Sequence, residues 1–130
     1  MIRIAAAGLA LALLAGPVGP ARAQDAAAGE KAFAKCRVCH QVGPTAKNVV
    51  GPKLNGLFGR AAGTIEGFRY SDANKNSGIT WTPETFTTYI KDPRAAMPGT
   101  RMVFAGVKNP TEIADLIAYL QQFDAAGNKK

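Results

Sequence analysis

The sequence has few of the residues that bind metals or form disulfides. Its 130 residues include two cysteines, one histidine and three methionines. A structural zinc site needs four Cys or His ligands, and the chain supplies three such residues in total. Alternating strand patterns are also sparse and no internal repeat is visible. These features favour a fold of helices joined by Gly- and Pro-rich loops, and they disfavour a sheet.

Acidic residues are outnumbered, with 9 Asp and Glu against 16 Lys and Arg and a formal net charge of +7. No basic run is longer than the final Lys129-Lys130 pair, which we expect to be a frayed, solvated tail. The positive excess is too diffuse to indicate nucleic-acid binding. It suits an acidic protein partner instead.

The first 23 residues have the pattern of a signal peptide. Arg3 is followed by an apolar run from Ile4 to Gly16, and Ala21-Arg22-Ala23 is typical of a cleavage site. We expect cleavage after Ala23, a periplasmic location, and one domain over residues 24–130. An uncleaved membrane anchor is the alternative, but the apolar run is shorter than the ~20 residues that span a bilayer. No later segment could span one either.

Both cysteines and the histidine lie together in Cys36-Arg37-Val38-Cys39-His40. Thiols at i and i+3 share one face of a helical turn, so they can bond two neighbouring points on one rigid molecule. The C-x-x-C-H pattern is typical of covalent haem attachment. We expect Cys36 and Cys39 to form thioethers with the vinyl groups, and His40 to be the proximal iron ligand.

Two other interpretations of this motif are weaker. A dithiol redox motif is expected in a βαβ context, which the sequence does not suggest. A disulfide between residues three apart would close too small a loop to stabilise much. Export agrees with haem, because c-type haem is attached outside the bacterial cytoplasm.

Capping residues predict where helices begin and end. Asp25 to Lys35 forms one helix and residues 71–76 form a single turn. Thr82-Pro83-Glu84 begins a helix that runs to about Lys91, before Pro93. Asn109-Pro110-Thr111-Glu112 begins another, with Glu112 at the capping-box position. Its apolar stripe, expected to pack on Ala32 and Phe33, is Ile113, Leu116, Ile117, Leu120 and Phe123.

Residues 41–70 are rich in glycine and contain two Gly-Pro pairs, which indicates loop. So long a loop inside a compact domain is unusual. A large rigid apolar ligand explains it, because loops can wrap around such a group.

The second axial ligand of the iron is open on residue chemistry alone. The absence of a second histidine excludes bis-His ligation within one chain. Met97, Met102, a lysine or no ligand remain. A neutral thioether paired with histidine would raise the reduction potential. Sequence spacing hardly distinguishes the two methionines as candidates for the second axial ligand, and residue chemistry favours Met102 only slightly.

Longer motifs carry a resemblance to a known family. They are Cys36 to His40, Gly51 to Arg60, Tyr70 to Trp81, Pro98 to Gly106, and Asp115 to Leu120. With these motifs the chain resembles the class I cytochromes c, of the mitochondrial-type and bacterial cytochrome c2 group, over essentially all of residues 24–130. The resemblance implies an all-α fold in which the N- and C-terminal helices cross and loops wrap one covalent haem.

The resemblance also implies roles for individual residues. Met102 would be the axial methionine, and Met97 a loop residue. Pro52 would accept the His40 ring N–H through its carbonyl. Tyr70 and Trp81 would bind the haem propionates, with Arg60 offsetting their charge. The remaining roles are a polar network beside the methionine (Asn74, Tyr89 and Thr100), a cover on the haem edge (Phe104), and the helix crossing (Gly29, Phe33, Leu116 and Tyr119).

The implied function is one-electron transport by a monomer that is not an enzyme. Its partners would be membrane complexes: a quinol–cytochrome c reductase of the bc1 type as donor, and a terminal oxidase or photosynthetic reaction centre as acceptor. Several lysines of the family's docking ring are missing, with Val49, Ala95 and Asn109 in such places. The candidate docking charges are Lys35, Lys47, Arg94, Arg101 and Lys108.

Two enzymatic alternatives stay open on the motif alone. A small peroxidase would need an open sixth position on the iron, and a dithiol oxidoreductase would need free thiols.

Overall fold

The computed structural model describes residue 16 and residues 25–130, so the expected signal-peptide cleavage after Ala23 lies outside the described residues. The elements are α1 (Ala26–Ala32), the 3₁₀ turn η1 (Phe33–Lys35), α2 (Asp72–Lys75), α3 (Pro83–Lys91), α4 (Pro93–Ala96) and α5 (Pro110–Gln121). Two isolated bridges are the only β-pairing in this part of the chain. The predicted all-α class is confirmed. No helix within the described residues has the length and apolar character needed to cross a membrane.

A capping side chain begins each α-helix by accepting hydrogen bonds from the first free backbone amides. These caps are Asp25, Ser71, Thr82, Asp92 and Asn109. The predicted limits of α3 are confirmed, and Thr85 completes its capping box. The expected box at α5 differs, because the Glu112 carboxylate pairs with Lys35 instead.

The short helix α4 was not predicted. Asp92 and Pro93 end α3, but Asp92 Oδ1 also accepts a hydrogen bond from the Ala95 amide, at 3.2 Å. The same two residues therefore stop one helix and start the next.

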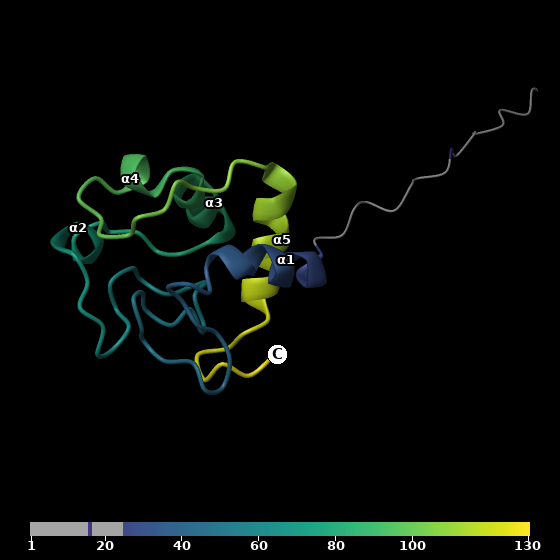
Figure 1. The fold of residues 1–130 in the computed structure, drawn as a ribbon, viewed down its shortest axis with the longest axis horizontal. Coiled ribbons are helices and arrows are strands. Elements are labelled where there is room, and N and C mark those ends of the chain that lie inside the picture. The colour runs from purple at the N-terminus through teal and green to yellow at the C-terminus, as the bar shows by residue number, and fades with distance from the viewer. Residues whose placement is uncertain (1–15, 17–24) are drawn as a thin grey trace, which may run out of the picture.

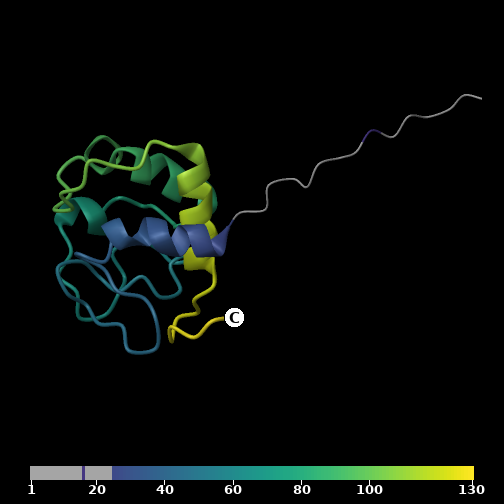
Figure 2. The same ribbon diagram turned by 45° about the vertical axis from the view of Figure 1, so that its right-hand side comes forward.

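The terminal helices α1 and α5 cross at Gly29 (Figures 1 and 2). A Cβ atom added to Gly29 would overlap the carbonyl oxygen of Asp115, so only glycine allows this approach. The Phe33 and Tyr119 rings meet beside the crossing with centroids 5.4 Å apart. The predicted crossing is confirmed, and it places the end of η1, just before Cys36, against α5.

Residues 41–70 contain no helix, as predicted, and the helix-free stretch extends over residues 36–71. The C-terminal end differs from the prediction. Phe123 and Lys129 form an antiparallel bridge, and the Lys130 amide donates to the Gln122 carbonyl at 2.8 Å. The expectation of a frayed tail is therefore wrong for the backbone, although both lysine side chains are exposed. Phe123 is buried just beyond the end of α5.

We expect Gly29→Ala to lower the free energy of unfolding by about 1–3 kcal/mol, the usual cost of overpacking. This loss should outweigh the ~1 kcal/mol that alanine gains over glycine in a helix. Denaturant unfolding of the haem-loaded protein measures the change. Ala27→Ser, which adds one atom at an exposed position of α1, is the control. A Gly29→Ala protein as stable as the parent would contradict the close crossing.

Candidate haem-binding site

The C-x-x-C-H residues form a compact turn directly after η1. The Cys39 and His40 amides both donate to the Cys36 carbonyl, at 3.0 and 2.8 Å. Both cysteine side chains are half-buried, and no disulfide joins them. Burial raises the pKa of the Cys36 thiol to about 11. Because dithiol oxidoreductases rely on a lowered thiol pKa, this environment disfavours dithiol chemistry.

The His40 ring is fixed by the segment that follows the turn. Its Nδ1 lies 2.8 Å from the Pro52 carbonyl oxygen. Since a carbonyl only accepts, Nδ1 carries the proton and Nε2 keeps its lone pair. A Cβ atom on Gly51 would overlap the ring, so Gly51 lets the backbone close over it. Burial lowers the pKa of His40, which favours the neutral imidazole that can bind a metal.

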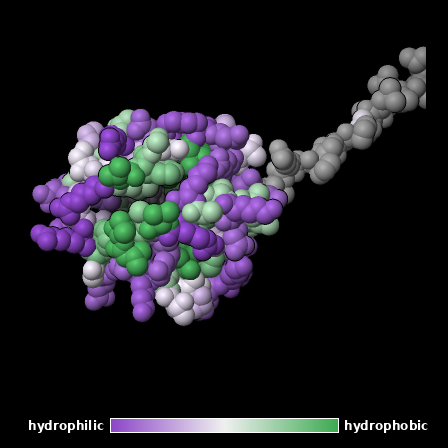
Figure 3. All heavy atoms as spheres, in the orientation of Figure 1, coloured by the Kyte–Doolittle hydropathy of each residue, from purple (hydrophilic) through white to green (hydrophobic). Residues whose placement is uncertain are grey.

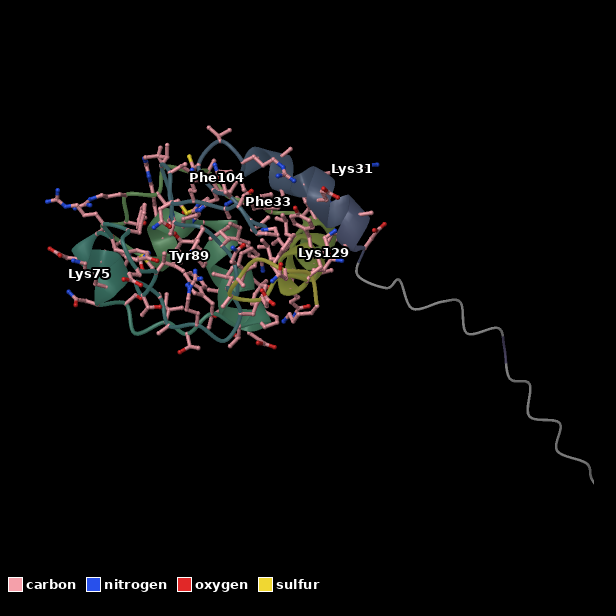
Figure 4. All side chains as sticks on the ribbon, turned by 90° about the horizontal axis from the view of Figure 1, so that it is seen from below. Lys31, Phe33, Lys75, Tyr89, Phe104 and Lys129 are labelled. Carbon is pink, nitrogen blue, oxygen red and sulfur yellow. The ribbon has the colours of Figure 1, made fainter. Side chains whose placement is uncertain are left out.

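These residues open onto a cavity of about 630 Å³. The structure brings every predicted site residue to its lining: Cys36, Cys39, His40, Pro52, Arg60, Tyr70, Asn74, Trp81, Tyr89, Thr100 and Met102. Phe104 lines it too. Figure 4 shows Phe33 and Tyr89 in the interior and Phe104 nearer the edge, while Lys31 and Lys75 lie at the periphery.

The surroundings of Met102 and Met97 in the structure are different, although their sequence spacing did not distinguish them. Met102 lines the cavity, and its Sδ accepts a hydrogen bond from the Tyr89 hydroxyl at 3.1 Å. The Met102 amide donates to Thr100 Oγ1 at 3.2 Å. Met97 is 3% exposed within the hydrophobic core and is not part of the cavity lining.

The predicted polar network of Asn74, Tyr89 and Thr100 is incompletely paired. Burial raises the pKa of Tyr89, and a hydrogen bond with the Thr100 side chain opposes that shift. Asn74 Oδ1 is buried without a hydrogen-bond partner in the described part of the chain. Since buried polar atoms are nearly always paired, this atom indicates room for a polar partner such as water or the edge of a bound group.

Arg60 adds a cation to the otherwise apolar lining. Its guanidinium donates to the Asn55 carbonyl at 2.8 Å. Neither ion pair found among residues 25–130 involves it. Burial lowers the pKa of Arg60, because a desolvated cation is unfavourable. An apolar cavity with an unpaired arginine fits a large apolar group that carries carboxylates, as haem does.

Comparison with known proteins gives one consistent result. The family model for cytochrome c matches residues 26–124. Cytochrome c2 of Blastochloris viridis is 66% identical over 120 residues, which cover 92% of this chain and 94% of the relative. Cytochrome c-550 of Nitrobacter winogradskyi is 57% identical over 82% of this chain and 97% of its own length. The solved structure of cytochrome c2 from Rhodospirillum centenum has a TM-score of 0.72 and 43% identity, covering 77% of this chain and 98% of that one.

The chain belongs to the cytochrome c family. Its relatives place it with the class I cytochromes of the bacterial c2 group, which are electron carriers and not enzymes. The family carries covalent haem c, and Cys36 and Cys39 are the attachment pair in this chain. The cavity volume, the two thiols, the imidazole, the thioether and the unpaired arginine all fit that group.

The sequence analysis did not predict three exposed valines at the site of this cytochrome c. Val38, Val50 and Val103 line the cavity and are 77%, 75% and 80% exposed. Figure 3 shows apolar surface gathered on one face among hydrophilic side chains. Val38 lies between the two cysteines and Val103 follows Met102, so proximity to site residues could have revealed them. Nothing in the sequence marks Val50.

Proposed function

We propose that His40 and Met102 are the axial iron ligands of an exported one-electron carrier. The observation that carries the proposal is the pairing of Met102 Sδ with the Tyr89 hydroxyl in the cavity that His40 also lines. The haem, when bound, supplies a ferric–ferrous couple. Two protein ligands that stay in place would keep the structural change between the two states small.

The surrounding residues would tune and shield these ligands. The Pro52 carbonyl would orient His40 and increase its basicity. The Tyr89 hydroxyl would hold the Met102 thioether in place. Tyr70, Trp81 and Arg60 would bind the propionates. A neutral thioether and apolar walls that exclude water both raise the reduction potential.

Replacement of the proposed sulfur ligand tests the ligation directly. We expect haem-loaded Met102→Ala to bind carbon monoxide when reduced and to have a lower reduction potential, since the iron loses its thioether. The matched control is Met97→Ala, which should keep the parent spectrum while losing about 2–5 kcal/mol of stability as a core truncation. Unchanged ligation in Met102→Ala, or lost ligation in Met97→Ala, would contradict the assignment. Rapid peroxide turnover by the parent protein would favour an open iron site instead.

We also propose that residues 1–23 direct export to the periplasm and are then removed. The Arg3 and Ile4–Gly16 pattern and the Ala21-Arg22-Ala23 site support this. Attachment of haem outside the cytoplasm is consistent with export.

Intact mass of the exported protein should show two changes together. The mass of residues 1–23 should be missing, and the mass of one haem should be added through Cys36 and Cys39. A Cys36→Ala, Cys39→Ala chain is the control, since it should lose the leader without gaining haem. A retained leader would indicate a membrane anchor and contradict cleavage.

The proposed redox partners are a bc1-type quinol–cytochrome c reductase and a terminal oxidase or photosynthetic reaction centre. The valines at the cavity would meet the partner, and the basic side chains would steer its approach. The five candidate charges differ in their surroundings. Lys35 pairs with Glu112, the Lys108 ammonium donates to the Lys91 carbonyl, and Arg101 donates to the Arg69 carbonyl at 3.4 Å.

Lys47 and Arg94 are exposed, and neither ion pair of the described residues involves them. They are therefore the most available steering charges. We expect Lys47→Glu and Arg94→Glu to slow reduction by a bc1-type complex at low ionic strength and to weaken its salt dependence. Stopped-flow kinetics over a salt series measures both. Lys130→Glu makes the same charge change at the exposed last residue of the chain, which is not one of the five candidate docking charges. An equal effect in that control would indicate net charge rather than docking at these positions.

A further inference from the structure

Asn55 is a buried polar side chain that the haem site does not use directly. It is 4% exposed and forms two hydrogen bonds with one residue, Gly43. Its Oδ1 accepts from the Gly43 amide, and its Nδ2 donates to the Gly43 carbonyl, both at 2.9 Å. This pair ties together the two ends of the segment 43–55, which contains Gly51 and Pro52.

The C-terminal turn, residues 124–128, covers this pair. A Cβ atom added to Gly127 would overlap the Gly43 carbonyl and lie 2.6 Å from Asn55 Nδ2. Beside it, the Gly56 amide donates to the Phe123 carbonyl at 3.3 Å. Figures 1 and 2 both show the yellow C-terminal segment beside the blue loop region.

Hydrogen bonds within the C-terminal turn define its shape. Asp124 Oδ1 accepts hydrogen bonds from the Ala126 and Asn128 amides, both at 2.9 Å. The Asp124 amide donates to the Asn128 carbonyl at 3.0 Å, and the Phe123–Lys129 bridge closes the turn. The C-terminal residues therefore form an ordered element with a buried contact face.

The segment beneath the turn holds the proximal histidine. The Gly51 amide donates to the Cys39 carbonyl at 2.7 Å, and the Leu54 amide donates to the Gln41 carbonyl at 3.0 Å. The Pro52 carbonyl, between these two bonds, meets His40 Nδ1. Displacing Asn55 from Gly43 would loosen the C-terminal side of this segment and so the carbonyl that orients the imidazole.

We propose that the C-terminal turn is a positioning element for the proximal ligand. The contact at Gly127 keeps the Asn55 side chain hydrogen-bonded to Gly43. That pair in turn keeps the Pro52 carbonyl hydrogen-bonded to the His40 ring. Asn55 and Gly127 are positioning residues, since they act through Pro52. The proposal rests on the proposed role of His40 as an axial ligand.

The test is Gly127→Ala in the haem-loaded ferrous protein. Proton NMR follows solvent exchange of the His40 Nδ1–H and of amides in the α1–α5 crossing. We expect the ring N–H to exchange at least roughly tenfold faster, by local opening, while exchange at the helix crossing is unchanged.

Gly78→Ala is the matched control. Gly78 also has a positive φ, of 69° against 85° at Gly127, but an added Cβ would meet nothing within 4 Å. It therefore adds left-handed backbone strain without the contact to Gly43. Equal ring N–H exchange in the two variants, or acceleration at His40 matched by acceleration at the helix crossing, would overturn the proposal.

A second variant tests the same proposal if Gly127→Ala does not fold. Asn55→Asp keeps the acceptor for the Gly43 amide and replaces the donor to the Gly43 carbonyl, and it should also accelerate exchange at His40. A haem-loaded Asn55→Asp protein with parental exchange would overturn the proposal as well. Failure of the His40 axial assignment can be told apart from failure of the positioning proposal. If His40 is not a ligand, the parent protein itself will lack a His40 ring N–H signal in the spectral region shifted by the haem.

Discussion

The covalent haem is the constraint on which the loops of this protein depend. Residues 36–71 contain no helix, and apolar side chains from this stretch, such as Leu54, Leu57 and Phe68, line the cavity. Ordering so long a segment costs conformational entropy at every residue. Contact with a large apolar group can offset that cost, and two thioethers keep the group attached. The terminal helices are different, because they pack directly on each other at Gly29.

That helix crossing also determines where the haem is held. Phe33, fully buried against Tyr119, begins the 3₁₀ turn η1 that leads into Cys36. Because Cys36 directly follows η1, the close contact between the two terminal helices lies next to the attachment point. The packing of α1 on α5 therefore positions the C-x-x-C-H motif, and the Gly51-Pro52 segment orients its His40 ring.

Local features were the ones that the sequence could predict. The limits of α3 depend on Thr82 and Pro93, whose effects act within one turn. The haem site was predictable because C-x-x-C-H places its chemistry in five consecutive residues. Choosing Met102 over Met97 needed the family resemblance, because the contact that distinguishes Met102 comes from Tyr89 on α3. The ordered C-terminal turn was missed because its partners, Gly43 and Gly56, are distant in sequence and give no local signal.

The two proposed ligands belong to separately supported parts of the molecule. The His40 ring contacts the Pro52 carbonyl within the segment 43–55, and the C-terminal turn covers that segment. Met102 depends on Tyr89 and on the return of the chain to α3, where the Val107 amide donates to the Ile90 carbonyl at 2.8 Å and a Cβ atom on Gly106 would overlap the Lys91 carbonyl. Disturbance of one side therefore need not reach the other. Loss of the proposed Met102 ligation should therefore leave the proposed His40 ligation in place, because the thioethers at Cys36 and Cys39 and the Pro52 carbonyl support it separately.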